Sequence, residues 1–159
     1  MPQCCRRMPG FVVAVLLLAS VAAAQPVRLP EEIRNTTAAL TPAQNRQLQE
    51  IAAKAMAAMT AAEDSVVADR RRDLEGPLPA ARLDSIGLRG YAAAVMAEAP
   101  KALQSERPVV RLNLAILLSR LCEIAPVPEA YPVIKAVLES DARGHAALRY
   151  WAAEALAHL

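Results

Sequence analysis

The sequence predicts an all-α protein, and three observations support this prediction. The chain is rich in Ala and Leu, which favour helices, and only 3% of its residues are aromatic. Apolar side chains recur at three- and four-residue steps over several segments, as on one face of a helix. No stretch alternates apolar and polar residues with the β-branched enrichment of a strand. We therefore expect a fold built from packed helices.

Residues 1–24 have the layout of an export signal. A basic start precedes a short apolar run over 11–18, and small residues follow. Ala22 and Ala24 form the small-x-small pattern that a signal peptidase accepts, so we expect cleavage after Ala24. The run is shorter than the roughly 20 residues that a helix needs to cross a bilayer, which argues against a stable membrane anchor. The sequence thus predicts an exported protein, periplasmic or secreted.

Removing this segment changes the charge and the cysteine content of the chain. The full sequence has 18 basic and 16 acidic residues. Because two arginines leave with the signal, residues 25–159 carry as many basic as acidic side chains, a balance that gives no indication of nucleic-acid binding. Cys4 and Cys5 leave as well, so Cys122 has no partner for an internal disulfide. We expect Cys122 to be a small buried hydrophobic residue.

Residues 25–40 are expected to form an extended leader with at most a short helical turn near Glu31–Thr37. A strong helix start follows, because Thr41 can cap the free backbone N–H groups and Pro42 suits the first helical position. Gln44 completes a capping box with Thr41. The first long helix is therefore predicted to begin at this point.

This helix is expected to run on through Val66 and Val67 into a charged stretch. Acidic residues stand three or four positions from the arginines of this stretch, which is typical of a solvated helix face with ion pairing. The same pairing argues against a basic binding patch at Arg70–Arg72. Gly76 and Pro77 are predicted to end the segment.

Four further helical segments are expected after this stop. They span about 80–104, 109–124, 129–139 and 145–159. In the first, Gly87 and Gly90 interrupt the early part and Pro100 should kink or break the helix. The second is almost wholly apolar, so it must be covered by other helices on most sides. In the third, the expected buried side consists of Tyr131, Ile134, Val137 and Leu138.

Two of these helices match each other at an offset of 38 residues. The matched pairs are Arg111 with Arg149, Ala115 with Ala153, Leu118 with Leu156, and Leu121 with Leu159. Each of the two helices follows a shorter one across a polar turn. A period near 40 residues with two helices per unit is typical of helical solenoid repeats.

This pattern resembles the HEAT repeat over about residues 88–159. In such repeats the second helix carries an aliphatic residue and Arg, then paired small residues, then Leu, and an acid lies in the preceding turn. The matching residues are Leu148-Arg149, Ala152-Ala153, Leu156 and the turn residue Asp141. The preceding unit departs from the pattern, since Leu114 replaces one small residue, Pro100 lies in its first helix and its turn lacks Asp.

The resemblance implies helical hairpins stacked as a short HEAT-like α-solenoid over 105–159, with the helices of 41–104 as a cap. Two repeats bury little surface, and at least three are usually needed for a stable stack. The last residues carry no polar cap. We therefore expect either a partner that covers this end or a larger exported HEAT-containing protein, of which this chain is the N-terminal fragment and whose activity lies elsewhere.

Residue patterns for catalysis or ligand binding are missing from the sequence. His145 and His158 have no Cys or His at metal-ligand spacing, so we expect no metal site. The sequence has neither a Gly-rich phosphate loop nor a Gly-x-Ser-x-Gly elbow, so we expect no cofactor. An enzyme that uses Cys122 with His145 is the remaining catalytic alternative, and it would require the two side chains to meet in space.

Four residues are candidates for partner binding or for contacts between repeats. They are Arg111, Arg149, Tyr150 and Trp151. The arginines either lock adjacent units against turn acids and helix carbonyls or form a row of cations that meets an acidic partner. Tyr and Trp are frequent interface anchors, although Trp151 can equally pack between helices. We expect a non-catalytic scaffold or adaptor that binds a protein or peptide, and the sequence leaves its oligomeric state open.

Overall fold

The computed structural model describes residues 26–78, 85–140 and 145–159, and the regular structure in these ranges is entirely helical. The helices are α1 (Glu31–Arg34), α2 (Pro42–Ala61), α3 (Val67–Glu75), α4 (Ile86–Leu103), α5 (Pro108–Ile124), α6 (Ala130–Ser140) and α7 (Ala146–Ala157). The all-α prediction is therefore confirmed for the described residues. The predicted export signal over 1–24 lies outside them.

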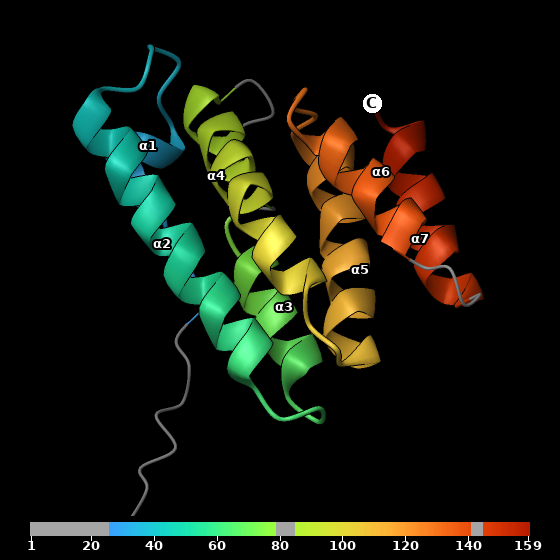
Figure 1. The fold of residues 1–159 in the computed structure, drawn as a ribbon. Helices are drawn as coiled ribbons and strands as arrows, with labels where there is room; N and C mark the ends of the chain where they lie inside the picture. Colours follow the sequence, from blue (N-terminus) through green and yellow to red (C-terminus); the bar gives the residue numbers. More distant parts are fainter. Residues whose placement is uncertain (1–25, 79–84, 141–144) are drawn as a thin grey trace, which may run out of the picture.

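The six longer helices pack in two layers (Figure 1). Helices α2, α4 and α6 follow one another in one layer, and α3, α5 and α7 follow one another in the other. Consecutive helices pair across the layers as α2–α3, α4–α5 and α6–α7, and we call these pairs the first, second and third hairpins. The most extensive packing joins α5 to α7 and α2 to α4, while the short α1 packs against α4.

The apolar core is continuous through the three hairpins. Its fully buried side chains include Met56 and Leu74 of the first hairpin, Tyr91 and Leu118 of the second, and Ile134 of the third. Buried apolar area is the main stabilising contribution to such a fold. The hairpins therefore share one core and do not form separate domains.

Helix α2 begins as predicted but ends earlier than expected. Gln44 N donates to Thr41 Oγ1 at 3.2 Å, and Thr41 N donates to Gln44 Oε1 at 2.9 Å, which completes the capping box. The predicted continuation through Val67 is wrong, because α2 ends at Ala61 and α3 starts at Val67. A continuous helix would carry Val67 and Leu74 away from the core, whereas the turn folds α3 back onto α2 and buries both side chains.

The charged residues of α3 pair as the sequence predicts. The pairs are Arg70 with Asp73, Arg72 with Asp69, and Arg71 with Glu75. Each pair lies three or four residues apart on the helix surface. The helix ends at Glu75 with Gly76 at its C-terminal cap, where a stop was predicted.

Of the kink or break of α4 predicted at Pro100, the break does not occur. The helix continues to Leu103, although proline removes one backbone hydrogen bond. Pro100 is exposed, and the flanking residues Ala99 and Ala102 are fully buried. Packing of these two small residues keeps the last turn helical despite the missing bond.

The glycines that were expected to interrupt α4 also lie inside the helix. At Gly87 an added Cβ would lie 1.8 Å from the carbonyl oxygen of Ile33, so glycine permits α1 to approach the α4 backbone. Ser85 supports the same junction, since its Oγ donates to the Arg34 carbonyl at 2.5 Å and accepts from Leu88 N at 3.2 Å. The predicted leader over 25–40 is thereby attached to the second hairpin.

Helices α5, α6 and α7 begin within about one residue of their predicted starts. The buried face of α6 differs from the prediction at Tyr131, which is 58% exposed. The buried positions of α6 are Ala130, Val133, Ile134 and Val137, a spacing that turns Tyr131 outwards. Cys122 is buried in α5, as expected.

Candidate functional site

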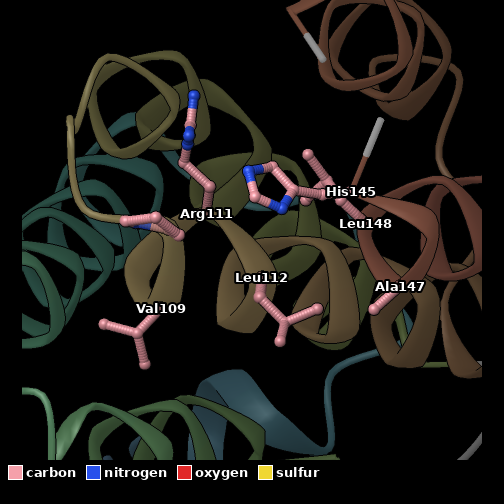
Figure 2. Close-up of a pocket in the computed structure, with 7 residues that line it drawn as sticks. Val109, Arg111, Leu112, His145, Ala147 and Leu148 are labelled. Carbon is pink, nitrogen blue, oxygen red and sulfur yellow. The ribbon is translucent and has the colours of Figure 1, made fainter. Parts of the chain in front are cut away.

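A pocket of about 200 Å³ lies between the first turns of α5 and α7. Its apolar lining comes from Pro108, Val109, Leu112, Ala147 and Leu148, and its polar residues are Arg111 and His145. Figure 2 shows the Arg111 side chain and the His145 ring next to each other, above Val109 and Leu112 in this view. The site thus combines two nitrogen-bearing side chains with an aliphatic surface.

Local sequence explains why these residues reach the pocket. Pro108 fixes the start of α5, so Val109, Arg111 and Leu112 fall in its first turns. His145 is the N-cap residue of α7, and its ring makes no capping hydrogen bond to the helix. Its carbonyl accepts the bond from Leu148 N at 2.9 Å. The ring is therefore free to face the pocket while its backbone starts the helix.

Arg111 is half-buried, and its Nε atom is buried without a hydrogen-bond partner in the described part of the chain. A guanidinium group carries N–H donors and no acceptor. Leaving such a donor unpaired away from water is costly.

The equivalent junction between the first and second hairpins is already closed by polar contacts. Arg107, at the N-terminus of α5, donates through Nε to Asp64 Oδ1 at 2.9 Å and through Nη1 to the Thr60 carbonyl at 3.1 Å. Arg71 of α3 donates to Asn113 Oδ1 of α5 at 3.0 Å. The cations at this junction therefore have acceptors from the chain itself.

Of the four predicted site residues, three lie together on α7 and Arg111 lies apart on α5. Arg111 lines the pocket, whereas Arg149 and Tyr150 are exposed on α7 outside its lining. Trp151 is half-buried against the core, and its ring meets that of Tyr150 edge to face, with centroids 5.3 Å apart. The turn residue Asp141 lies outside the described residues, and no other acid in the described ranges bonds to Arg111.

His145 is the site residue that the sequence reasoning did not assign to a binding surface. A usable signal was present, because the 38-residue offset that aligns the helices also aligns His145 with Arg107. Both residues are N-caps of the second helix of a hairpin. The aliphatic lining could not be identified in the same way, since every helix of this chain has similar residues.

The Cys122–His145 pair is not assembled in this fold. Cys122 lies in the last turns of α5, roughly 15 Å along the helix from Leu112 at a rise of 1.5 Å per residue. Burial raises the pKa of the Cys122 thiol to about 11. Both facts argue against a reactive thiolate at this position.

The described ranges also show neither a metal-binding cluster nor a membrane-spanning helix. No cluster of three or more His, Cys, Asp or Glu residues there is arranged to hold a metal ion. None of the helices described is long and apolar enough to cross a membrane. Comparison with protein families, curated proteins and solved structures found no match to the chain.

Proposed function

We propose that this protein is an exported, non-catalytic scaffold or adaptor, built as a short HEAT-like α-solenoid, that binds another protein or a peptide. The observation that carries the proposal is the order of helix packing. Each hairpin contacts the next through equivalent helices, α2 on α4 on α6 and α3 on α5 on α7. Nearest-neighbour stacking of this kind is characteristic of solenoid repeats.

The spacing of the helices along the chain supports the same proposal. Helices α2, α4 and α6 begin at residues 42, 86 and 130, so the starts are separated by equal intervals of 44 residues. Two-helix repeats of the HEAT type have periods of about 40–47 residues. Three such units meet the minimum for a stack that buries a continuous core.

The chemistry of the described residues favours binding over catalysis. The buried Cys122 thiol, with its raised pKa, is unsuited to nucleophilic attack. The α6–α7 end of the molecule exposes Tyr131 and Tyr150, at 58% and 59% of their surface. Exposed aromatic side chains are frequent anchors at protein interfaces. Export is supported by the signal pattern at the N-terminus of the sequence.

The proposal is tested by affinity capture with protein purified after export, applied to the exported fraction of the same cells. The test variants are Arg149→Ala and Tyr150→Ala, both at exposed positions of α7. The matched control is Lys54→Ala, at an exposed position of α2. We expect the unaltered protein and the control to retain the same partners, and each test variant to retain less of them.

Two results would contradict the proposal. One is that no protein is retained above the level of an unrelated bait. The other is that all variants retain identical partners in identical amounts, which would remove the α7 surface as the binding region. Circular dichroism of each variant checks that the helices remain intact.

A further inference from the structure

We infer that α7 binds the α7 of a second copy of this chain, so that two molecules pair about a two-fold axis with these two helices parallel. The inference rests on the proposed function, whose binding surface is also α7, and it names one partner of that surface. It is carried by the apolar face that α7 exposes, by the polar face at the other end of the fold, and by the charges beside the apolar face.

The outer face of α7 is apolar and exposed. Figure 1 shows α7 at one end of the row of helices, where it packs on α5 and α6. The exposed side chains that form one line along its outer side are Ala146, Tyr150, Ala153 and Ala157. Steps of three and four residues place them on one face of the helix. Leu148 and Ala155 on the opposite side are buried in the core.

This face has the position at which one helix of the stack receives the next. At the 38-residue offset, Ala153 and Ala157 correspond to Ala115 and Ser119 of α5. Both residues of α5 are buried, and the most extensive packing of α5 is on α7. Helix α7 thus leaves exposed the positions that helix packing buries in α5.

The outer face of the first hairpin has the opposite character. Exposed positions of α2 include Asn45, Gln49, Glu50 and Lys54. The exposed large hydrophobic side chains of the described ranges lie in the third hairpin or directly after it, and they are Tyr131, Tyr150 and Leu159. A polar first hairpin is a poor partner for the apolar face of α7, so copies do not stack head to tail. Contact between two identical α7 faces is isologous and closes as a dimer.

The charged residues beside the apolar face decide the direction of pairing. In a seven-residue frame abcdefg with Tyr150 at a and Ala153 at d, Arg149 is at g and Glu154 is at e. In a parallel pair the g position faces the e position five residues further along the partner, so Arg149 meets the partner's Glu154 twice by symmetry. An antiparallel pair brings like flanks together, with arginine near arginine and glutamate near glutamate. Charge therefore favours the parallel pair.

Both charged groups are accessible to a partner. Arg149 is exposed, and 43% of the Glu154 side chain is accessible. Glu154 Oε1 lies 3.9 Å from His158 Nε2 on the same helix, a wide separation that leaves the carboxylate able to accept from an outside arginine. A pair of helices of 12 residues buries less surface than a standard protein interface, so we expect a weak dimer that depends on concentration.

The test is sedimentation velocity of protein purified after export, over micromolar to millimolar concentrations. We expect a monomer at the lowest concentrations and a dimer, without larger species, at the highest. Ala153→Arg places like charges on the two-fold axis at an exposed position, and it should keep the protein monomeric throughout. Circular dichroism checks that each variant remains helical.

Charge reversal tests the pairing of Arg149 with the partner's Glu154. Arg149→Glu and Glu154→Arg should each weaken dimerisation by about fivefold or more, because each creates two pairs of like charges. The double variant, and an equal mixture of the two single variants, restore opposite charges and should dimerise as the unaltered protein does. The control is Arg46→Glu, at an exposed position of α2, which should leave dimerisation unchanged.

Four results would overturn the inference. They are a monomer at every concentration, single reversals that dimerise as tightly as the unaltered protein, a double variant that dimerises no more tightly than the single ones, and an equal loss with Arg46→Glu. The last result would assign the association to the first hairpin.

The outcome can be separated from that of the scaffold proposal, because sedimentation uses the purified protein without any other partner. A monomer that still captures other proteins would overturn the dimer and leave the scaffold standing. A dimer that captures no other protein would overturn the scaffold and leave the α7 pairing standing.

Discussion

The two junctions between hairpins are built from similar helices but held by different interactions. Side-chain hydrogen bonds cross the first junction from Arg107 to Asp64, from Arg71 to Asn113, and from the Tyr91 hydroxyl to the Leu74 carbonyl. Between described residues of the second and third hairpins no such bond is formed, and α5 packs on α7 through apolar side chains. The first junction is therefore held partly by directional hydrogen bonds, whereas the described part of the second depends on apolar packing.

The two junctions have equivalent positions in the molecule. The first joins α2 and α3 to the central pair α4–α5, and the second joins the same central pair to α6 and α7 (Figure 1). Apolar packing is non-directional. It therefore stabilises the third hairpin against the second without fixing the orientation of the polar side chains at the edge of that contact. The comparison predicts that the second junction is sensitive to lost packing and the first to lost hydrogen bonds.

The largest effect is expected from Leu148→Ala, which removes the apolar contact of α7 with α5. Leu148 is 4% exposed, and truncation of a buried leucine typically lowers the free energy of unfolding by about 2–5 kcal/mol. Urea denaturation followed by circular dichroism measures the change. Leu159→Ala, at a residue that is 49% exposed, is the control and should change stability little. Equal effects of the two substitutions would contradict the apolar account of the second junction.

A smaller effect is expected from Tyr91→Phe at the first junction. The fully buried Tyr91 hydroxyl donates to the Leu74 carbonyl at 2.8 Å, and burial raises the pKa of Tyr91, so the group remains a donor. Removing it leaves a buried carbonyl without this partner, which should lower the free energy of unfolding by about 1–2 kcal/mol. Tyr131→Phe, at an exposed tyrosine, provides the matched comparison in the same denaturation assay. A Tyr91→Phe protein as stable as this control would show that the bond contributes little.

The smallest effect is expected from Arg107→Gln. The Arg107–Asp64 pair is partly exposed, with 35% and 70% of the two side chains accessible, so solvent screens the attraction. We expect a loss of about 0.2–1 kcal/mol that shrinks as the salt concentration rises. A double-mutant cycle with Asp64→Asn measures the coupling between the two side chains. A coupling that does not change with salt would indicate that the pair acts through geometry and not through charge.

Much of the local structure could be predicted because its signals lie within a few residues. The Thr41–Gln44 capping box, the start of α5 at Pro108 and the stop at Gly76 each depend on neighbours in sequence. The ion pairs of α3 are likewise set by three- and four-residue spacing. The 38-residue match also singled out α5 and α7, which pack against each other in the fold.

The predictions that were wrong depended on contacts between distant residues. Pro100 remains helical because its buried neighbours pack against other helices. Tyr131 is exposed because the other helices of the fold cover the neighbouring face of α6. The pocket was not found from sequence because Arg111 and His145 belong to different hairpins, and their meeting requires α7 to pack on α5.

By itself, the sequence determined that the described part of the chain is helical and where most of its helices begin. It also determined how the charged side chains of α3 pair with one another. These features follow from local hydrogen bonding and from the apolar periodicity of each segment. The tertiary structure decided where α2 ends, which face of α6 is buried, and which arginine Nε atoms are buried without an acceptor. The physical reason is that burial and hydrogen-bond satisfaction are properties of the packed helices together, and no single segment contains both partners.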